Sequence, residues 1–449
     1  MNTPQFYGRP LSGWVKGLGR GGAIALLLAL AACQSEAPPT ETDATSEESS
    51  EAAAPEATGE GLKLGTVLPI TGDLAQYGGP MQDSVSLLVD TVNACGGALG
   101  QPVTLISEDD QTEPSAGASA MTKLAEVDQV AGVVGAAASS VSSAAVDIAV
   151  RNEVVQISPS STSPVFTERA LAGDFDGFWF RTAPPDTFQG IALAELAQEN
   201  GYETVAVLAI NNDYGNGLVD SFSSAFQDLG GAIANNDDPT LYPPDATTFD
   251  SEVIEAFSGS PDAVMIVAYP ETGSLILKSA YEQGLLDGSV DVILTDGMKD
   301  DSVAELVGQT PEGTYIIEGV IGTAPSSGGP GLDAFQELYT SEYDRDPGVF
   351  DPNSWDAAAL IVLAAEAAQS NTGTDIKGAI PDVANAPGQE VSDVCEALEL
   401  VRSGEDINFQ GASSMVDLDE QGDVSGSYDI WTIAEDGSIE VTDTVSVGG

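Results

Sequence analysis

The chain of 449 residues contains no histidine, only 3 cysteines, and only 13 lysines and arginines against 71 aspartates and glutamates. Without histidine it cannot form a Ser-His-Asp or Cys-His catalytic centre, and the usual zinc sites lose a common ligand. The formal net charge of −58 repels phosphate, so we expect no nucleic acid among the partners. We likewise expect no metal and no cofactor.

The excess of acid does not make the chain a disordered polyanion. Only 19% of the residues are charged and 42% are hydrophobic, which is enough apolar material for a large core. Because single cores stop growing at about 250–300 residues, a folded body of this length is expected to have two lobes. A surface so rich in carboxylates stays soluble in concentrated salt, and we interpret it as the mark of a halophilic source.

The first 32 residues have the pattern of a secretory signal peptide. They contain three basic residues and no acid, and their apolar run at 22–32 is shorter than the ~20 residues that span a bilayer. The run ends in Leu30-Ala-Ala-Cys33, which resembles a bacterial lipobox. We therefore expect residues 1–32 to be a lipoprotein signal peptide and Cys33 to be lipidated; the alternative is an ordinary signal peptide with an incidental cysteine.

Residues 33–60 are expected to form a disordered acidic tether. From 34 to 60 the chain has eight acids, no lysine or arginine and no large apolar side chain, so it cannot bury a core. The protein is then exported and lipid-anchored to the membrane, either in a periplasm or on the cell surface.

The two remaining cysteines are Cys95 and Cys395. In an exported protein, two remaining thiols pair more often than they stay free. We expect a disulfide between them, with two free thiols as the alternative.

From residue 61 onward, short apolar runs alternate with longer helical patterns. Repeated strand–helix units of this kind predict an α/β fold with parallel sheets covered by helices. Ligands of such sheets bind beyond the carboxyl ends of the strands. The predicted strands are 62–68, 103–107, 130–134, 154–157, 204–210, 263–267 and 292–294, and the predicted helices are 81–93, 116–126, 142–151, 188–199, 217–229 and 272–283.

Hydroxyl side chains gather just after the third and fourth predicted strands. Ser139 and Ser140 follow the third, and Ser160, Ser161 and Thr162 follow the fourth. A turn of this kind offers backbone N–H groups, a helix dipole and O–H donors, which together hold a carboxylate without a cation. The alternative is that these serines only cap helices.

The order of several motifs resembles the leucine/isoleucine/valine-type amino-acid-binding proteins of bacterial ABC importers. The resemblance covers 62 to about 435, nearly the whole folded body. The motifs are Leu68-Pro-Ile-Thr-Gly-Asp-Leu-Ala-Gln-Tyr-Gly78, Asn93-Ala-Cys-Gly-Gly-Ala-Leu-Gly100, Glu108-Asp-Asp110, Ile157-Ser-Pro-Ser-Ser-Thr-Ser-Pro164, Phe180-Arg-Thr-Ala-Pro184, Asn212-Asp-Tyr-Gly215, Gln410-Gly-Ala-Ser-Ser414 and Asp419-Glu-Gln-Gly-Asp423.

This resemblance implies a type I periplasmic-binding-protein fold: two doubly wound parallel-sheet lobes, joined by three hinge crossovers, that close on an amino acid. We expect the crossovers near 182–185, 319–323 and 412–415. The N-terminal lobe then comprises 61–184 plus 319–412, and the C-terminal lobe comprises 185–318 plus 413–449.

The resemblance also implies a ligand-binding set. Ser139, the Ser161 backbone N–H and Thr162 would hold the ligand carboxylate, with Ser140 beside them. The Ser160 carbonyl, the Thr162 hydroxyl and Asp296 would face the ammonium. Tyr77, Tyr214 and Tyr269 match aromatic positions that wall the side-chain pocket. Without the resemblance, Asp296 would be read as a turn former and the tyrosines as packing or surface residues.

The implied function is capture without chemistry, so we expect no enzyme. The protein would be the solute-binding component of an ABC importer and deliver a branched-chain or other neutral amino acid to a membrane permease. Ser160 and Ser161 replace two alanines common in the family, and Asp296 is one methylene shorter than the usual glutamate, which leaves a small polar ligand or an amide such as urea as alternatives. A receptor of the same fold coupled to a sensor kinase or chemoreceptor is the second reading.

Overall fold

The computed structural model describes residues 61–234 and 239–447. The expected signal peptide, the lipidated Cys33 and the acidic tether lie outside these residues. Among the described residues, no helix has both the length and the apolar character that crossing a membrane requires.

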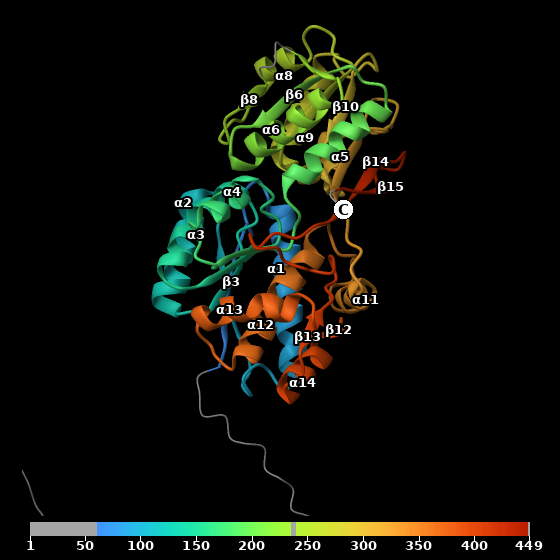
Figure 1. Cartoon of the computed structure of the whole chain (residues 1–449). Helices are drawn as coiled ribbons and strands as arrows, with labels where there is room; N and C mark the ends of the chain where they lie inside the picture. Colours follow the sequence, from blue (N-terminus) through green and yellow to red (C-terminus); the bar gives the residue numbers. More distant parts are fainter. Residues whose placement is uncertain (1–60, 235–238, 448–449) are drawn as a thin grey trace, which may run out of the picture. The chain divides into compact units, whose positions relative to one another are not determined.

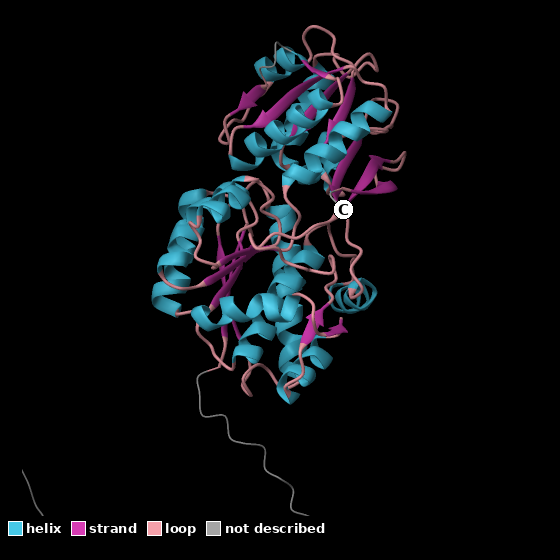
Figure 2. Ribbon diagram, viewed as in Figure 1, coloured by secondary structure: helices cyan, strands magenta, loops and turns pink. Residues whose placement is uncertain are grey.

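The first lobe is built on a five-stranded sheet in the order β2-β1-β3-β4-β5, with every pair parallel. Because β1 lies inside the sheet and the chain continues to both sides of it, the lobe is doubly wound. Figure 2 shows helices on both faces of this sheet. The strands are β1 (Lys63–Leu68), β2 (Thr104–Asp109), β3 (Gly132–Gly135), β4 (Val155–Ser158) and β5 (Trp179–Arg181).

Helices connect these strands as the alternating pattern predicts. The first of them begins earlier than expected and contains Pro80. A proline near the start of a helix removes only one main-chain hydrogen bond, so the helix can include it. The helical elements are α1 (Ala75–Ala94), α2 (Pro114–Thr122), η1 (Lys123–Asp128), α3 (Ser139–Arg151) and α4 (Val165–Ala172).

The second lobe contains an eight-stranded sheet in the order β15-β14-β11-β10-β9-β6-β7, with β8 also paired to β6. All pairs are parallel except β11–β14 and β14–β15, which add an antiparallel edge. The strands are β6 (Thr204–Ile210), β7 (Ala232–Ile233), β8 (Thr240–Tyr242), β9 (Ala263–Val267), β10 (Asp291–Leu294), β11 (Ile321–Pro325), β14 (Ser427–Ile433) and β15 (Ile439–Ser446). The helical elements are α5 (Asp186–Glu199), α6 (Asp213–Asp228), α8 (Asp250–Ala256), α9 (Pro270–Glu282), η2 (Asp296–Met298) and α10 (Ser302–Val307).

The chain then returns to the first lobe (Figure 1). Helix α12 (Asp351–Ala368) is buried over almost its whole length, because it packs against α1, β3 and β4 and is covered by two further helices. The other elements of this return are α11 (Leu332–Tyr343), α13 (Gly373–Ala384), α14 (Val394–Ser403) and the paired strands β12 (Gln389–Val391) and β13 (Ile407–Phe409).

Two of the three crossovers lie later than the sequence analysis placed them. The second was expected at 319–323, but Ile321–Pro325 is strand β11 of the second sheet, so the chain leaves that sheet only after Pro325. The third was expected at 412–415, but Gly422 and Asp423 still bond to Arg181 at the end of β5. We therefore propose lobe boundaries of 61–181 plus 332–424 and 186–325 plus 427–447, with the first crossover at 182–185.

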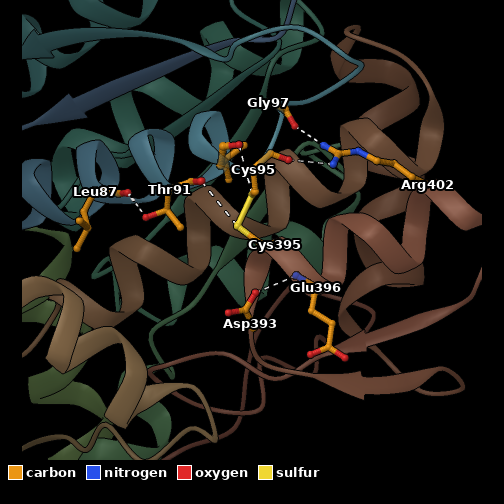
Figure 3. The surroundings of a disulfide bond; sticks show 9 residues. Leu87, Thr91, Cys95, Gly97, Asp393, Cys395, Glu396 and Arg402 are labelled. Atoms are coloured by element: carbon orange, nitrogen blue, oxygen red, sulfur yellow. Dashed lines mark hydrogen bonds between the residues drawn. A yellow bond between two sulfur atoms is a disulfide. The ribbon is translucent and has the colours of Figure 1, made fainter. Parts of the chain in front are cut away.

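A disulfide joins the end of α1 to α14, as Figure 3 shows. The Cα atoms of Cys95 and Cys395 are 5.8 Å apart across 300 residues of sequence. The Arg402 guanidinium donates a hydrogen bond of 3.2 Å to the Cys95 carbonyl, so the same helix is attached there a second time. The bond fastens the returning segment of the first lobe to the helix that follows its first strand.

Replacing both Cys95 and Cys395 by serine is expected to lower the free energy of unfolding by up to about 5 kcal/mol, because the link restricts a very long loop in the unfolded chain. Urea denaturation of the double variant and of the parent protein, each in high salt, measures the difference. Equal denaturation midpoints, or equal masses after alkylation with and without prior reduction, would rule out the bond.

Candidate functional site

One cavity collects residues from both lobes. It encloses about 340 Å³ of empty space, including its opening to solvent. Six of the nine residues expected to bind a ligand line it, namely Tyr77, Ser139, Ser160, Tyr214, Tyr269 and Asp296, and the remaining lining residues are Leu74, Ala137, Ala138, Gly297 and Phe350.

The lobes touch each other around this cavity. The Tyr77 hydroxyl of the first lobe donates a hydrogen bond of 3.1 Å to the Asp296 carbonyl of the second. The Ser163 hydroxyl donates one of 2.8 Å to the carbonyl of Asp213, at the start of α6. The structure therefore shows the cleft in a closed arrangement.

The loop after β4 forms one side of the cavity, and its serines are mostly engaged within the loop. The Ser161 N–H donates to the Ser158 hydroxyl at 2.9 Å, and the Ser161 hydroxyl donates to the Ala137 carbonyl at 3.0 Å. The Ser161 N–H is thus already bonded, contrary to its expected role toward a ligand carboxylate. In the described part of the chain the Thr162 N–H meets no hydrogen-bond acceptor, which makes it the free amide of this turn.

The two serines at the start of α3 face different spaces. Ser139 lines the cavity, and its hydroxyl accepts a hydrogen bond of 3.3 Å from the Ser163 N–H. Ser140 instead lines an adjoining groove at the cleft mouth, which it shares with Asp73 and Glu271. The structure therefore separates two residues that the sequence analysis grouped.

Asp296 supplies the acid on the opposite side. It begins the short turn η2 directly after β10 and is 3% exposed. Its Oδ1 atom accepts a hydrogen bond of 2.7 Å from the Tyr214 hydroxyl, which also contacts the Thr295 hydroxyl at 2.8 Å. Burial raises the pKa of Asp296 to about 6, although the Tyr214 hydrogen bond acts in the other direction.

A second buried acid, Asp186, was not predicted from the sequence. It is the first residue of α5 and fully buried, and its N–H donates a hydrogen bond of 2.8 Å to the Thr162 carbonyl. Among the described residues its carboxylate oxygens make no hydrogen bond of good geometry. Burial, and then the negative charge of Asp296, raise the pKa of Asp186 well above its usual range, and the nearby Thr162 hydroxyl lowers that pKa only in part. An acid after Pro-Pro at a helix start looks like an ordinary helix-start residue, so the sequence carried no distinct signal.

Aromatic rings close the rest of the cavity. The rings of Tyr214 and Tyr269 stack with centroids 5.7 Å apart, and the Asn212 amide donates a hydrogen bond of 3.2 Å to the Tyr269 hydroxyl. The ring centroids of Tyr77 and Phe350 lie 6.0 Å apart in an edge-to-face arrangement. Phe350 was missed because it comes from the returning segment, more than 250 residues after Tyr77 in the chain.

The arrangement suits a zwitterion. Hydroxyls and a free amide lie on one side, Asp296 lies on the other, and aromatic rings close the space between them. The second buried acid, Asp186, adjoins the turn at Thr162 and does not line the cavity. Charged hydrogen bonds in such a dry site each contribute about 1.5–3 kcal/mol.

Comparisons with known proteins agree with this fold. The family model described as "Receptor family ligand binding region" matches residues 80–436. The chain is 26% identical over 371 residues to the "Chemotactic signal transduction system substrate-binding protein BasB" of Halobacterium salinarum, covering 80% of this chain and 84% of the relative. It is 29% identical over 331 residues to "Leu/Ile/Val-binding protein homolog 2" of Brucella abortus, covering 72% and 82%.

Among solved structures, the leucine-binding protein LivK of Thermotoga maritima matches with a TM-score of 0.71. The two chains are 24% identical, and the match covers 86% of this chain and 99% of the other. Similarity at this level establishes the fold: two α/β lobes of the type I periplasmic-binding-protein kind.

The buried acids make stability depend on pH in an unusual direction. Burial raises the folded pKa of Asp296 to about 6 and those of Asp110 and Asp356 to about 7, above the usual 3.8. At a pH between the usual 3.8 and the raised pKa of each group, the folded state binds more protons than the unfolded state. The free energy of unfolding should therefore rise as the pH falls from 8 to 5. Each group contributes up to about 1.4 kcal/mol per pH unit within its own window.

Urea denaturation of the unliganded protein from pH 5 to 8, in concentrated salt that screens surface repulsion, measures this slope. The variant Asp356→Asn should show a shallower dependence, because the amide does not titrate. A midpoint that stays constant or falls on acidification from pH 8 would contradict the prediction.

Proposed function

Because the chain belongs to the receptor ligand-binding-region family, as a type I periplasmic binding protein of the Leu/Ile/Val-binding kind, we propose that it captures a neutral amino acid for an ABC importer. The family consists of binding proteins and not of enzymes. The observation that carries the proposal is the cavity itself, in which Ser139 and Ser160 of one lobe face Asp296 of the other.

The ligand carboxylate is assigned to the first lobe. Ser139 and Ser160 line the cavity, and the Thr162 N–H is the unused amide of the same turn. Among the described residues no lysine or arginine lines the cavity, so these neutral donors and the dipole of α3 would hold the carboxylate.

The ligand ammonium is assigned to the acids. Asp296 presents a carboxylate at the cavity wall. The buried carboxylate of Asp186 is close enough to interact with the charge of Asp296 and lies next to the Thr162 hydroxyl. A cation entering here relieves the burial of two like charges, which is the reason for assigning the ammonium and not the carboxylate to this side.

The ligand side chain is assigned to the rings of Tyr77, Tyr214, Tyr269 and Phe350. These rings favour an apolar group of modest size, such as a branched-chain side chain, while the two tyrosine hydroxyls that bond Asp296 add polar edges. A small polar amino acid, or an amide such as urea, is therefore the alternative ligand.

Delivery to a membrane permease and anchoring through a lipid on Cys33 complete the proposal. Export is supported by the apolar run before Cys33 and by the disulfide between Cys95 and Cys395, a bond typical of oxidising compartments. The anchor would keep the binding protein beside its permease, in a periplasm or on the cell surface.

A signalling receptor is the second candidate, and the Halobacterium relative favours it because its name assigns it to chemotactic signal transduction. The net charge of −58 suits a protein that stays soluble in concentrated salt. Neighbouring genes separate the two functions: genes for a permease and an ATPase support import, whereas a gene for a chemoreceptor or sensor kinase supports signalling.

Neutral amino acids are expected to raise the melting temperature of the purified protein, and Asp296→Asn should abolish this shift because it removes the charge facing the ammonium. At 100 times its dissociation constant, a ligand adds about 2.7 kcal/mol of stability. Thermal melts with a panel of amino acids and urea, at several salt concentrations, provide the measurement. Asp301→Asn, which removes a nearby acid outside the cavity, should keep the shift. A panel without any shift would remove the basis of the proposal.

Asp186→Asn is expected to weaken binding of the best amino acid in that panel by about tenfold or more, which corresponds to losing one charged hydrogen bond. The unliganded variant should be at least as stable as the parent at pH 8, since an amide avoids burying an unpaired charge. Calorimetric titration and urea denaturation measure the two effects. Unchanged affinity would show that Asp186 does not serve the ammonium.

A further inference from the structure

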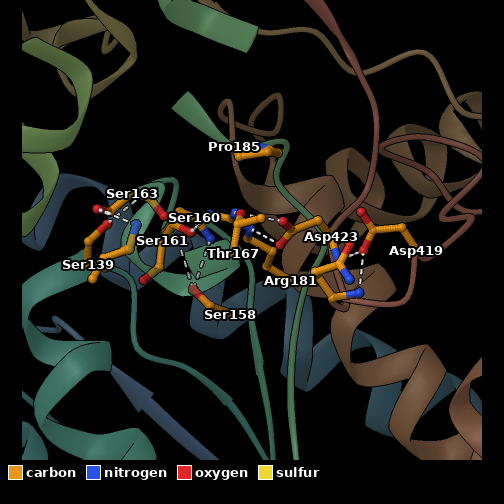
Figure 4. A network of polar contacts seen from close by, with 12 residues as sticks. Ser139, Ser158, Ser160, Ser161, Ser163, Thr167, Arg181, Pro185, Asp419 and Asp423 are labelled. Atoms are coloured by element: carbon orange, nitrogen blue, oxygen red, sulfur yellow. Dashed lines mark hydrogen bonds and ion pairs between the residues drawn. The ribbon is translucent and has the colours of Figure 1, made fainter. Parts of the chain in front are cut away.

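Arg181, the last residue of β5, is fully buried and uses its guanidinium for four hydrogen bonds to three segments (Figure 4). Its Nη1 donates to the carbonyls of Ser161 at 3.1 Å and Ser163 at 2.9 Å. Its Nε donates to Oδ1 of Asp423 at 2.6 Å, and Nη2 donates to the Thr167 hydroxyl at 2.8 Å. One cation therefore holds together the turn after β4 (158–163, the ligand loop), the start of α4 and the segment just before the third crossover.

The Arg181 contacts fix the direction of the free amide in the turn. In a trans peptide the carbonyl and the N–H point to opposite sides. Since the Ser161 carbonyl is held by Arg181, the Thr162 N–H of the same peptide must point away from Arg181. That N–H is the one amide of the turn that meets no acceptor among the described residues.

The partner of Arg181 belongs to the segment that leads into the second lobe. Asp423 is 5% exposed, and its Oδ2 also accepts a hydrogen bond of 2.5 Å from the Thr167 hydroxyl. The Arg181 N–H donates to the Gly422 carbonyl at 3.0 Å, so main chain and side chain hold the same point. Strand β14 of the second sheet begins only four residues after Asp423.

We propose that Arg181 is a positioning residue for carboxylate binding, and that its ion pair with Asp423 ties the ligand loop to the segment that leads into the third crossover. Arg181 touches no ligand in this scheme. It orients the Ser161–Thr162 peptide toward the ligand and links that orientation to the strand that carries the second lobe. The proposal deepens the proposed function and rests on it for the identity of the bound group.

We call the contacts of Arg181 with the Ser161 and Ser163 carbonyls and with Asp423 the clamp. Two variants weaken it in different ways. Arg181→Lys keeps the charge, but its single ammonium cannot reproduce the planar fork that serves both carbonyls and Asp423. Asp423→Asn keeps an oxygen acceptor for Nε and removes the charge. Glu366→Gln is the matched control, because Glu366 is a buried first-lobe acid beside Arg402 that bonds the Leu99 N–H and does not contact the ligand loop.

Binding of L-leucine and of L-leucinamide, which lacks the carboxylate, is compared by calorimetry. Wild type and Glu366→Gln should prefer L-leucine. Arg181→Lys should lose about tenfold or more of that preference, and Asp423→Asn should lose less, because the clamp acts on the carboxylate half alone. General loss of packing would weaken both probes equally and leave their ratio unchanged, which would overturn the proposal.

Hydrogen–deuterium exchange of the unliganded proteins provides a test that needs no ligand. Amides in 158–163 should exchange faster in Arg181→Lys and Asp423→Asn than in wild type, while Glu366→Gln should leave them unchanged. If wild type binds neither probe and no member of the amino-acid panel, but exchange responds as expected, the proposed function fails and the clamp stands. If exchange in this loop is the same in all four proteins, the clamp itself is refuted.

Discussion

Two buried carboxylates without a neighbouring free cation are the constraint on which this cleft depends. Asp186 and Asp296 both lie inside the closed structure, and the basic residue next to them, Arg181, already pairs with Asp423. Taking like charges out of water is unfavourable unless a cation joins them. In the proposed function a positive group of the ligand relieves this burial, which would offset the cost of keeping such acids in the empty fold.

The scarcity of basic residues explains how the other half of the site is built. With 13 lysines and arginines in the whole chain, a cation is seldom at hand to meet a ligand carboxylate. The turn after β4 supplies neutral donors in its place, and the one basic residue close to it, Arg181, works from behind by holding the Ser161 and Ser163 carbonyls. The proposed anion site would thus depend on the orientation of the backbone amides and not on a facing charge, so the contacts that fix the peptide planes would set its affinity.

The sequence predicted what repeats locally, and it was less informative where distant segments meet. Strands, helices and the cavity residues Ser139, Ser160 and Asp296 follow from apolar runs and from the ordered motifs. Asp186 resembles any helix-start acid, and Phe350 reaches the cavity from a segment that returns after the whole second lobe. The hydrogen bond from the Ser161 N–H to the Ser158 hydroxyl is a detail of turn geometry that the sequence did not reveal. The later crossovers depend on β11 and on the Arg181–Asp423 pair, both of which require knowledge of the tertiary structure.

The contacts of Asp356 and Arg181 limit where the lobes can rotate. At its start the third connecting segment is held by Asp356, whose carboxylate accepts hydrogen bonds of 2.7 Å from the Ala412 and Ser413 N–H groups, and at its end by Arg181. Only 425–426 then separate the first lobe from β14, whose Tyr428 hydroxyl donates a hydrogen bond of 3.2 Å to the carbonyl of Pro185 in the first crossover. Domain closure concentrates its dihedral changes in a few residues between rigid parts. One of those rigid parts ends at Arg181, which also holds the turn proposed to bind the carboxylate. In that proposal, ligand binding at the turn and rotation at the hinge act on the same side chain.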